Sequence, residues 1–498
     1  MDLSYTTLLP VLIVLSSLVP GLLIFMVRED QFALRTALNL SGVVIKLGLV
    51  GLMLYGVSQG LDFRFELPFL TGAPLVLHGD ALSLQFITLS SVLWLATTIY
   101  AIGYLEDAPL RSRFFGYFSL CVSATVGLAL AGNLITFLLF YELLTLATFP
   151  LVVHRGTPVA LRAGRVYLAC TLGGGTLLLM GVALLHSLAG TPDFVPEGYL
   201  GALVEDHSLS LQVAFVLMIA GLGVKAALVP LHSWLPQAMV APAPVSALLH
   251  AVAVVKAGAF GIVRVVYDVY GVAVSSLLML TLPLLILAAV TILYGSIRAL
   301  QQTDIKKRLA FSTVSQVSYI TLGVALAGPL AAIGGIVHLV HQGVMKVTLF
   351  FCAGIFAETL GVHRVQELNG IGKRMPWTMT AFTIAALGMI GVPPIAGFIS
   401  KWYLGAGAVA AGQPWVIIVL VTSTLLNAAY FLPLLKRIWL HDPPRQWPAE
   451  AQVSRLETAA MVGSSITTAL FSLAVGLLAG FPLSPLNWVT GIVTEYFP

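Results

Sequence analysis

The sequence predicts an all-α polytopic membrane protein of about fourteen transmembrane helices. Of the 498 residues, 58% are hydrophobic and only 9% are charged, whereas soluble proteins carry roughly a quarter charged residues. Apolar runs of about 20 residues, the length that crosses a bilayer as a helix, recur along the whole chain. The charged residues gather between these runs, and basic and acidic residues gather in different connections.

Fourteen apolar segments account for the predicted helices. The first segment is apolar for too long to be a typical secretory signal and no clear cleavage site follows it, so we interpret it as a retained helix. The predicted helices lie near residues 8–27, 35–57, 81–104, 112–131, 132–153, 165–190, 210–229, 241–266, 271–297, 307–328, 330–357, 376–409, 412–438 and 456–482. The longest connections on one side are 58–80 and 191–209.

The basic residues between the helices predict the orientation of the chain. Connections that follow odd-numbered helices hold 18 of the 25 lysines and arginines. Connections that follow even-numbered helices hold only Arg64, together with the acidic residues Asp62, Glu66, Asp80, Asp193, Glu197, Glu205, Asp206 and Asp268. Lysine and arginine are enriched in cytoplasmic connections. We therefore expect a multi-pass protein of a prokaryotic inner membrane with both termini on the non-cytoplasmic side.

Several classes of chemistry find no support in the sequence. Cys121, Cys170 and Cys352 lie far apart within apolar segments, and the absence of a CxxC pair argues against a disulfide, zinc or iron–sulfur site. The sequence contains no phosphate-binding glycine loop and no haem-attachment motif. No basic tract suggests nucleic acid. We expect no cofactor and no metal, and no redox or hydrolytic site in this chain itself.

Six basic residues are not counted in the connections between the predicted helices, and one acid lies deep within a predicted helix. A charge at the centre of a bilayer costs about 2.5–3.5 kcal/mol on insertion scales, so such residues usually face protein or water and carry function. The acid is Glu142, and the bases are Lys46, Lys225, Lys256, Arg264, Lys346 and Lys401. Arg264 lies near a helix end, four residues before Asp268, which favours a structural role with its head group at the interface. For Lys46, a structural and a functional role both stay open.

Glu142 and the buried lysines form the first candidate site. A lysine far from water holds its proton weakly, and a nearby carboxylate makes it hold the proton more firmly. A lysine whose distance from a glutamate changes would therefore take up and release a proton. The alternative is a static ion pair that ties two helices together.

Histidines extend this line of ionisable residues. His250 precedes Lys256 by six residues in one predicted helix. Residues of a later helix share one stripe at helical spacing, namely His338, His341, Gln342 and Lys346. Because histidine titrates near neutral pH and uses both ring nitrogens, we interpret the stripe as a hydrated proton relay. The alternative is an interhelical hydrogen-bond cluster.

Two predicted helices carry helix-breaking residues beside a buried lysine. Lys225 is followed by Pro230, Pro236, Pro242 and Pro244. Lys401 is preceded by Gly391, Pro393, Pro394 and Gly397. Irregular backbone at membrane depth persists only inside protein or along a watery cavity. One interrupted helix in each half of a chain indicates inverted repeats with a transport site between them, although each break alone could be a proline kink without function.

Three motifs resemble a known family. The stretch KAALVPLHSWLPQAMVAPAPVSALLHAVAVVKAG, from Lys225 to Gly258, resembles the signature of the antiporter-like subunits of respiratory complex I, Mrp-type cation/proton antiporters and membrane-bound hydrogenases. GVPPIAGFISK, which ends at Lys401, resembles the second broken helix of that family. FYELLTLATFPLV, which contains Glu142, resembles its fifth helix. The resemblance covers nearly the whole chain.

The resemblance implies two inverted five-helix repeats, helices four to eight and nine to thirteen, each with a broken helix. The corresponding segments are an N-terminal three-helix segment at 1–110, the repeats at 111–268 and 269–438, and a C-terminal helix and tail at 439–498. Members of the family bind no redox cofactor themselves and work beside sister subunits.

The resemblance also implies roles for the candidate residues. Glu142 would pair with Lys225. His250 and Lys256 would pass protons to the stripe of the eleventh helix, and Lys401 would carry them on the exit side. Some members have a histidine at the position of Gln342, so either His341 or Gln342 could relay here.

Two departures from the family pattern narrow the choice of complex. Lys401 stands where one complex I paralogue has an acid, which argues against that paralogue. The chain ends soon after the fourteenth predicted helix, so we expect no long lateral arm of the kind found in the largest paralogue. An Mrp D-type or hydrogenase-type subunit is favoured over the smaller complex I paralogue, which remains open.

The predicted function is translocation of protons across the membrane, with exchange of Na⁺ for H⁺ as one version of it. The expected partners are sister antiporter-like subunits and small membrane subunits of one complex, H⁺ and Na⁺ as transported ions, and the lipid bilayer. Two alternatives stay open: a non-pumping structural membrane subunit of such a complex, and a stand-alone carrier of an organic solute.

Overall fold

The computed structural model describes residues 4–497 except 71, 106–107 and 449–454. Parts of the predicted segments 1–110 and 439–498 therefore lie outside the described residues. The first half of the chain forms α1 (Tyr5–Ile24), α2 (Phe32–Ser58), β1 (Arg64–Leu70), β2 (Ala73–His78), α3 (Ala81–Tyr104), α4 (Arg111–Ala129), α5 (Leu134–Val152), α6 (Pro158–Ala189), α7 (Val204–Lys225), α8 (Trp234–Gln237), α9 (Ala243–Ala251) and α10 (Val254–Arg264).

The second half continues with helices of similar length. A π-helical segment, η3 (Val265–Tyr270), joins α10 to α11 (Gly271–Leu277). The remaining helices are α12 (Thr281–Leu300), α13 (Ile305–Ala325), α14 (Pro329–Leu360), α15 (Ile371–Arg374), α16 (Pro376–Ile390), α17 (Ala396–Ala410), α18 (Trp415–Leu440), α19 (Arg455–Leu477) and α20 (Pro485–Tyr496). Short 3₁₀ turns lie at Gly201–Leu203, Ala238–Val240 and Val365–Leu368.

The helical membrane fold predicted from the sequence is confirmed. Within the part of the chain that is described, eleven helical segments are long and apolar enough to cross a membrane. α4, α13 and the interrupted pair α16–α17 occupy the places of the other three predicted helices. The count of fourteen remains a prediction.

The structure shows three features that the sequence did not predict. β1 and β2 pair antiparallel inside the predicted connection 58–80, with Gly72 at positive φ between them. The predicted helix 241–266 is divided, because the backbone leaves helical geometry at Val252 and Ala253. α20 follows the last predicted helix and is capped by Ser484, whose hydroxyl accepts a hydrogen bond from the backbone N–H of Asn487. An N-cap of this kind satisfies one of the free amides of a helix start.

The two predicted breaks are present where the prolines stand. α7 ends at Lys225, and Pro230 lies in the irregular stretch before the single turn α8, which contains Pro236. α16 ends at Ile390, with Gly391 in the left-handed conformation, and α17 resumes at Ala396 after Pro393 and Pro394.

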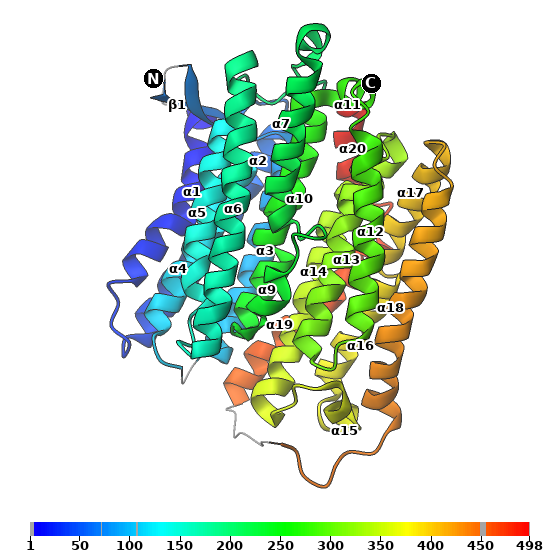
Figure 1. Cartoon of the computed structure of the whole chain (residues 1–498). Helices are drawn as coiled ribbons and strands as arrows, with labels where there is room; N and C mark the ends of the chain where they lie inside the picture. The colour runs from blue at the N-terminus through cyan, green and yellow to red at the C-terminus, as the bar shows by residue number, and fades with distance from the viewer. Residues whose placement is uncertain (1–3, 71, 106–107, 449–454, 498) are drawn as a thin grey trace.

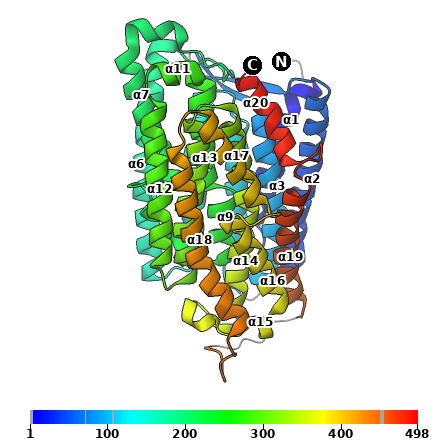
Figure 2. The same ribbon diagram turned by 90° about the vertical axis from the view of Figure 1, so that its right-hand side faces the viewer.

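The helices stand roughly side by side, and both termini reach the same end of the bundle (Figure 1). In this view α5 and α6 lie on one flank, α17 and α18 lie on the other, and α14 lies between them. The view turned by 90° shows the termini again at one end, with α15 at the opposite end (Figure 2). All of residues 243–271 are buried, and so are all of residues 331–356. These two spans therefore form the core of the molecule.

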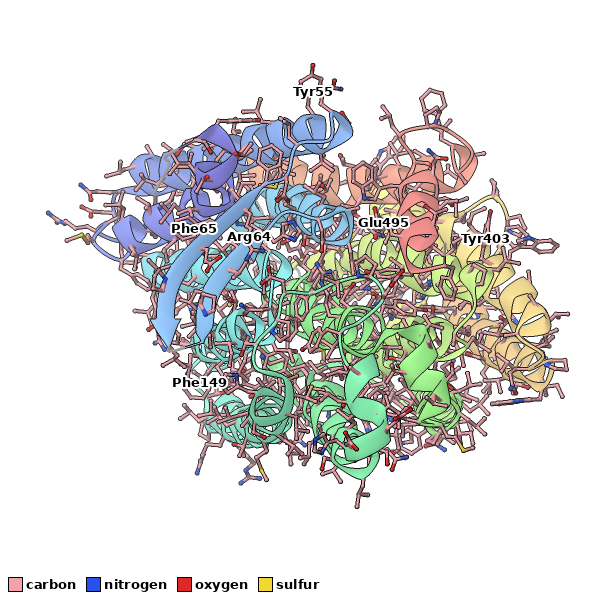
Figure 3. The ribbon with its side chains drawn as sticks, turned by 90° about the horizontal axis from the view of Figure 1, so that it is seen from above. Tyr55, Arg64, Phe65, Phe149, Tyr403 and Glu495 are labelled. Carbon is pink, nitrogen blue, oxygen red and sulfur yellow. The ribbon has the colours of Figure 1, made fainter. Side chains whose placement is uncertain are left out.

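Ionic contacts tie together the end of the bundle that carries the termini. Figure 3 looks down on this end, with Arg64 on the hairpin and Glu495 on α20. Arg64 binds Asp193 and therefore joins the two longest connections, as well as contacting Glu66 at 3.1 Å. These contacts hold the hairpin against the connection that contains Asp193.

Candidate functional site

Lys225 contacts Tyr141, the residue that precedes Glu142 in α5. Lys225 is fully buried at the last position of α7. Its ammonium donates a hydrogen bond to the Tyr141 carbonyl and lies 3.4 Å from the centre of the Tyr141 ring. Glu142 is half-buried, and among the described atoms its Oε1 has no hydrogen-bond partner. Electrostatic interaction links the two charges, but no ion pair within 4.0 Å joins them in the described part of the structure.

The middle of the molecule holds buried polar groups without partners. The Nζ of Lys256 and both ring nitrogens of His250 and His341 make no hydrogen bond to any described residue. The same holds for both amide atoms of Gln342. All four side chains are at most 1% exposed. Because buried polar groups in proteins nearly always have a partner, these atoms mark places where water is expected.

The helix break that the sequence did not predict lies within this group. His250 is near the end of α9, and Lys256 is in the first turn of α10. The His250 ring lies against the Phe350 ring of α14, with centroids 4.6 Å apart. α14 therefore packs directly beside the break.

The other half of the α14 stripe is hydrogen-bonded. His338 Nδ1 lies 2.7 Å from the Ser400 hydroxyl of α17. Lys346 Nζ donates to the Leu309 carbonyl at 3.0 Å and to the Ser312 hydroxyl at 2.7 Å, both on α13. The stripe predicted from helical spacing thus faces the break between α9 and α10, α13 and α17.

Three side chains that the sequence reasoning missed connect Lys346 to Lys401. Ser312 Oγ lies 3.0 Å from the Tyr430 hydroxyl, which donates to Asn427 Oδ1 at 2.7 Å. The Asn427 amide donates to the Met389 carbonyl at 3.3 Å, and Lys401 Nζ donates to the same carbonyl at 3.2 Å. Nothing in the sequence alone distinguishes Tyr430 and Asn427 from other polar residues of apolar helices.

Lys401 lies at the edge of the bundle. Its ammonium also donates to the Ile390 carbonyl at 2.6 Å and to the Thr424 hydroxyl at 3.2 Å. It is partly exposed and lines a cavity of about 570 Å³ between α17 and α18. Glu142 and Lys401 are the two partly exposed members of the line. The helices that carry them, α5 and α17, lie on opposite flanks of the molecule (Figure 1).

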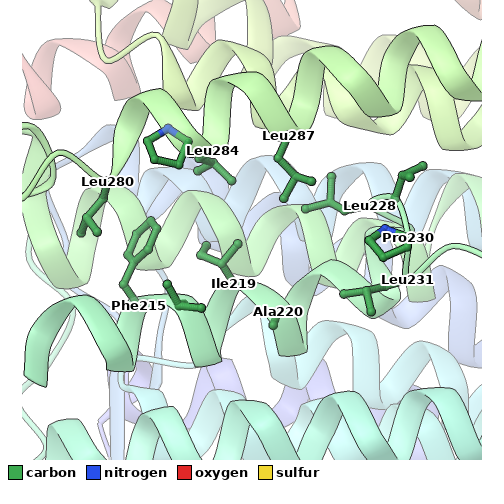
Figure 4. A pocket seen from close by; sticks show the side chains of 12 residues that line it. Phe215, Ile219, Ala220, Leu228, Pro230, Leu231, Leu280, Leu284 and Leu287 are labelled. Carbon is green, nitrogen blue, oxygen red and sulfur yellow. The ribbon is translucent and has the colours of Figure 1, made fainter.

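The cavity beside the first break has a different character. It measures about 260 Å³ and lies between α7, the stretch after Lys225, and α12 (Figure 4). Phe215, Ile219, Leu228 and Leu284 line it with apolar surface. An apolar cavity does not conduct ions, so this one provides room beside the break and no polar route.

Arg264 is paired inside the protein and is not exposed at a helix end. It is 2% exposed and forms ion pairs with Asp80 at 2.7 Å and Asp268 at 2.8 Å. Asp268 is 2% exposed and accepts a hydrogen bond from Tyr496 of α20. Glu142 is therefore not the one acid within the spans. The sequence could not show that Asp80 and α20 close over Arg264.

Lys46 lies apart from the line. It is fully buried, its ammonium donates to Ser17 Oγ at 2.5 Å, and it lies 4.8 Å from the centre of the Trp94 ring. None of these partners belongs to the line.

These features define a class of protein: a polytopic helical membrane protein whose interior carries a line of ionisable side chains across two interrupted helices. In the described part of the chain no cluster of metal-ligating side chains is present. Residues 131–427 match the family described as NADH:quinone oxidoreductase/Mrp antiporter, TM. The chain belongs to this family, as the three sequence motifs predict.

Relatives come from each of the complexes that the motifs resemble. The chain is 37% identical over 412 residues to NADH-quinone oxidoreductase subunit N of Desulforudis audaxviator, covering 80% of each protein. It is 27% identical to the D-type component of the Na(+)/H(+) antiporter of Bacillus subtilis, covering 98% of this chain and 95% of that protein. It is 33% identical to hydrogenase-4 component B of Escherichia coli, covering 76% of this chain and 58% of that protein.

Solved structures share the fold over the whole chain. A chain of the Mrp complex from Dietzia sp. DQ12-45-1b superposes with a TM-score of 0.84 at 24% identity, covering 100% of both chains. A chain of the membrane-bound sulfane sulfur reductase, an archaeal respiratory membrane complex, superposes with a TM-score of 0.85 at 23% identity, covering 99% of this chain and 97% of that one. At these identities the likeness concerns the fold.

Proposed function

We propose that this chain translocates protons across a membrane as one subunit of a multisubunit complex. The observation that carries the proposal is the series of largely buried ionisable and amide side chains that extends through the bundle. Its members are Glu142, Lys225, His250, Lys256, His338, His341, Gln342, Lys346 and Lys401. A membrane protein keeps such groups at high cost, and they usually serve transport.

The pattern of partners supports transfer over static ties. A tie between helices would pair its charged groups with each other, as Nη1 of Arg264 pairs with Asp80 and Asp268. The Nζ of Lys256 and the ring nitrogens of His250 and His341 instead make no hydrogen bond to the described residues. Water molecules that satisfy these atoms would also complete a proton route through the middle of the chain.

The hydrogen bonds of the second half suggest how the route continues. A tyrosine hydroxyl has one proton, so Tyr430 donates it to Asn427 while Ser312 donates to Tyr430 and Lys346 donates to Ser312. If Lys346 lost its proton, it would accept from Ser312 and the chain of hydroxyls would reverse. The charge on Lys346 is thereby coupled to the surroundings of Lys401.

The partly exposed ends of the line suggest where partner subunits bind. The helices that carry Glu142 and Lys401 lie on opposite flanks (Figure 1), and neither side chain is covered completely by this chain. We propose sister membrane subunits at these flanks, in a complex of the Mrp, hydrogenase or complex I type. The proposal includes a prokaryotic inner membrane, termini on the non-cytoplasmic side and two inverted repeats at 111–268 and 269–438. Na⁺ as a second transported ion belongs to the antiporter version.

The test uses everted membrane vesicles from cells whose own copy of the subunit is replaced by a variant. Glu142→Gln and Lys225→Ala are expected to abolish proton movement, followed by acridine-orange fluorescence, while the amount of assembled complex on native gels stays unchanged. Lys373→Ala is the control, because Lys373 is an exposed lysine paired with Asp442. It should leave both readings unchanged.

The outcomes separate this function from its alternatives. Normal proton movement in either variant would refute the relay. Loss of assembly together with loss of movement would indicate a structural subunit. Transport of a solute by the chain alone in liposomes would indicate a stand-alone carrier.

A further inference from the structure

Three consecutive glycines in α6 face three different surroundings. A methyl group on Gly173 would meet open space within 4 Å. One on Gly174 would lie 2.8 Å from the side chain of Val224 and 3.0 Å from the carbonyl of Gly221, both on α7. One on Gly175 would lie against Glu142 of α5. The three residues are glycines in consecutive positions of one helix, and they differ only in the atoms that surround them.

The space beside Gly175 is filled by the carboxylate of Glu142. A Cβ at Gly175 would overlap Glu142 Oε1 and would lie 2.6 Å from Cδ and 3.1 Å from Oε2. The approaches to Oε1 and Cδ are far inside van der Waals contact, so the carboxylate and a larger residue 175 cannot both keep their places. The carboxylate is the end of a flexible side chain, so it can move while the α5 and α6 backbones stay where they are.

No described group fixes this carboxylate by a hydrogen bond to Oε1. Oε1 of Glu142 is buried and makes no hydrogen bond to a described atom. Its position is therefore determined by the room that α6 leaves and by the charge of Lys225. We propose that Gly175 is a positioning residue, which admits the Glu142 carboxylate into the α5–α6 contact and so sets its distance from Lys225. This inference rests on the proposed function of Glu142 in proton transfer.

Gly175→Ala follows from this geometry as the test. Alanine is a better helix former than glycine, so the substitution does not weaken α6 by itself. We expect the vesicle rate of proton movement to fall on the order of tenfold to a hundredfold, the range that follows a displacement of about 1 Å in a reacting group. We also expect the pH at which the rate is half-maximal to shift, because the carboxylate leaves its place beside Lys225. Gly173→Ala is the matched control and should keep the rate and the pH profile.

One further variant decides between positioning and general damage. Glu142→Asp combined with Gly175→Ala shortens the side chain by one methylene, returns the lost room, and should recover part of the rate lost in Gly175→Ala. If Gly175→Ala reduces assembly of the complex, the same Asp variant should restore it.

The results distinguish failure of this inference from failure of the function. A wild-type rate and pH profile in Gly175→Ala, beside an inactive Glu142→Gln, would overturn the positioning role and leave proton transfer intact. Failure of Glu142→Asp to recover rate or assembly would also overturn it. Normal proton movement in Glu142→Gln would refute the proposed function itself.

Discussion

Tyr430→Phe tests the connection between Lys346 and Lys401 that the structure reveals. The substitution removes one hydroxyl and keeps the aromatic ring, which packs against Phe431 with centroids 4.7 Å apart. Tyr430 is fully buried, so the vacated partners Ser312 and Asn427 gain no contact with bulk water. The variant therefore interrupts the hydroxyl chain without opening a large cavity.

The size of the effect follows from the contacts that are lost. Asn427 Oδ1 loses the donor at 2.7 Å that the structure gives it, whereas Ser312 keeps Lys346 at 2.7 Å. A buried acceptor left without a partner costs about 1–3 kcal/mol. We expect a loss of stability in this range. If the same interaction lowers the barrier for transfer, about 1.4 kcal/mol of it corresponds to a tenfold slower rate.

The assay compares two fully buried tyrosines, one connected to the line of ionisable residues and one outside it. Tyr430→Phe is measured in everted vesicles for proton movement and in detergent for thermal unfolding of the complex. Tyr270→Phe is the control, because the Tyr270 hydroxyl donates to the Leu211 carbonyl at 2.7 Å and lies outside the line. Both variants should lose similar stability, and only Tyr430→Phe should transport slowly. Equal transport in the two variants would refute a role for Tyr430 in transfer and leave it as a packing residue.

Three other predictions concern charges of the interior and of the end that carries the termini. Lys256→Met should abolish proton movement while the complex melts at the same temperature or higher, since no described hydrogen-bond partner of Lys256 Nζ is lost; a clear drop in melting temperature would show that the amine is a structural tie. Lys46→Met should keep at least half of the wild-type rate of proton movement, because Lys46 contacts Ser17 and Trp94 and no member of the line. A change of about a factor of two corresponds to a small change in barrier. An inactive variant would place Lys46 on the route. Burial raises the pKa of Asp80, but the charge and hydrogen bonds of Arg264 outweigh it and lower that pKa to about 2. The ion pair should therefore stabilise the protein fully above the unfolded pKa of about 4 and lose its effect as pH falls towards 2. The Asp80→Asn variant should melt at a lower temperature than wild type at pH 7, and the two melting temperatures should approach each other at pH 3. An unchanged difference between the two melting temperatures would contradict the assignment.

The sequence predicts the membrane fold and the charged line because both depend on local composition. Apolar runs identify helices wherever a bilayer is the solvent, and a lysine such as Lys225 or Lys346 within such a run stands out by its cost. The breaks at Pro230 and Pro393 are equally local, because proline removes a backbone donor.

Other features depend on contacts between distant segments and leave no such pattern. Tyr430 matters because it meets Ser312, 118 positions away along the chain. The sequence alone does not reveal the partner of Arg264, because Asp80 lies 184 positions earlier in the chain. It therefore predicts that Arg264 lies at the interface. The division of the predicted helix 241–266 at Val252 and Ala253 has no glycine or proline to indicate it. Tertiary packing decides these features.

Both broken helices bring the C-terminal end of a helix close to a lysine, although the sequence order differs. Prolines follow Lys225 but precede Lys401. In the structure Lys225 ends α7, and Lys401 donates to the carbonyls of Met389 and Ile390, the last two residues of α16. The carbonyls that end a helix have no partner within it, and the helix dipole favours a cation at that end.

The end of α16 therefore provides acceptors for the Lys401 ammonium, and the end of α7 places Lys225 where the helix dipole favours a cation. Lys256 has the opposite surroundings, because it lies in the first turn of α10, where the dipole disfavours a cation. A proton that crosses the molecule would then rest at the two helix ends and pass quickly over the middle. Moving the break should move the resting place: if Pro393→Ala and Pro394→Ala together extend α16 past Ile390, Lys401 should lose its carbonyl partners and proton movement should stop. Retained transport with a continuous helix, seen in a structure of that variant, would refute the idea that the helix ends hold the charge.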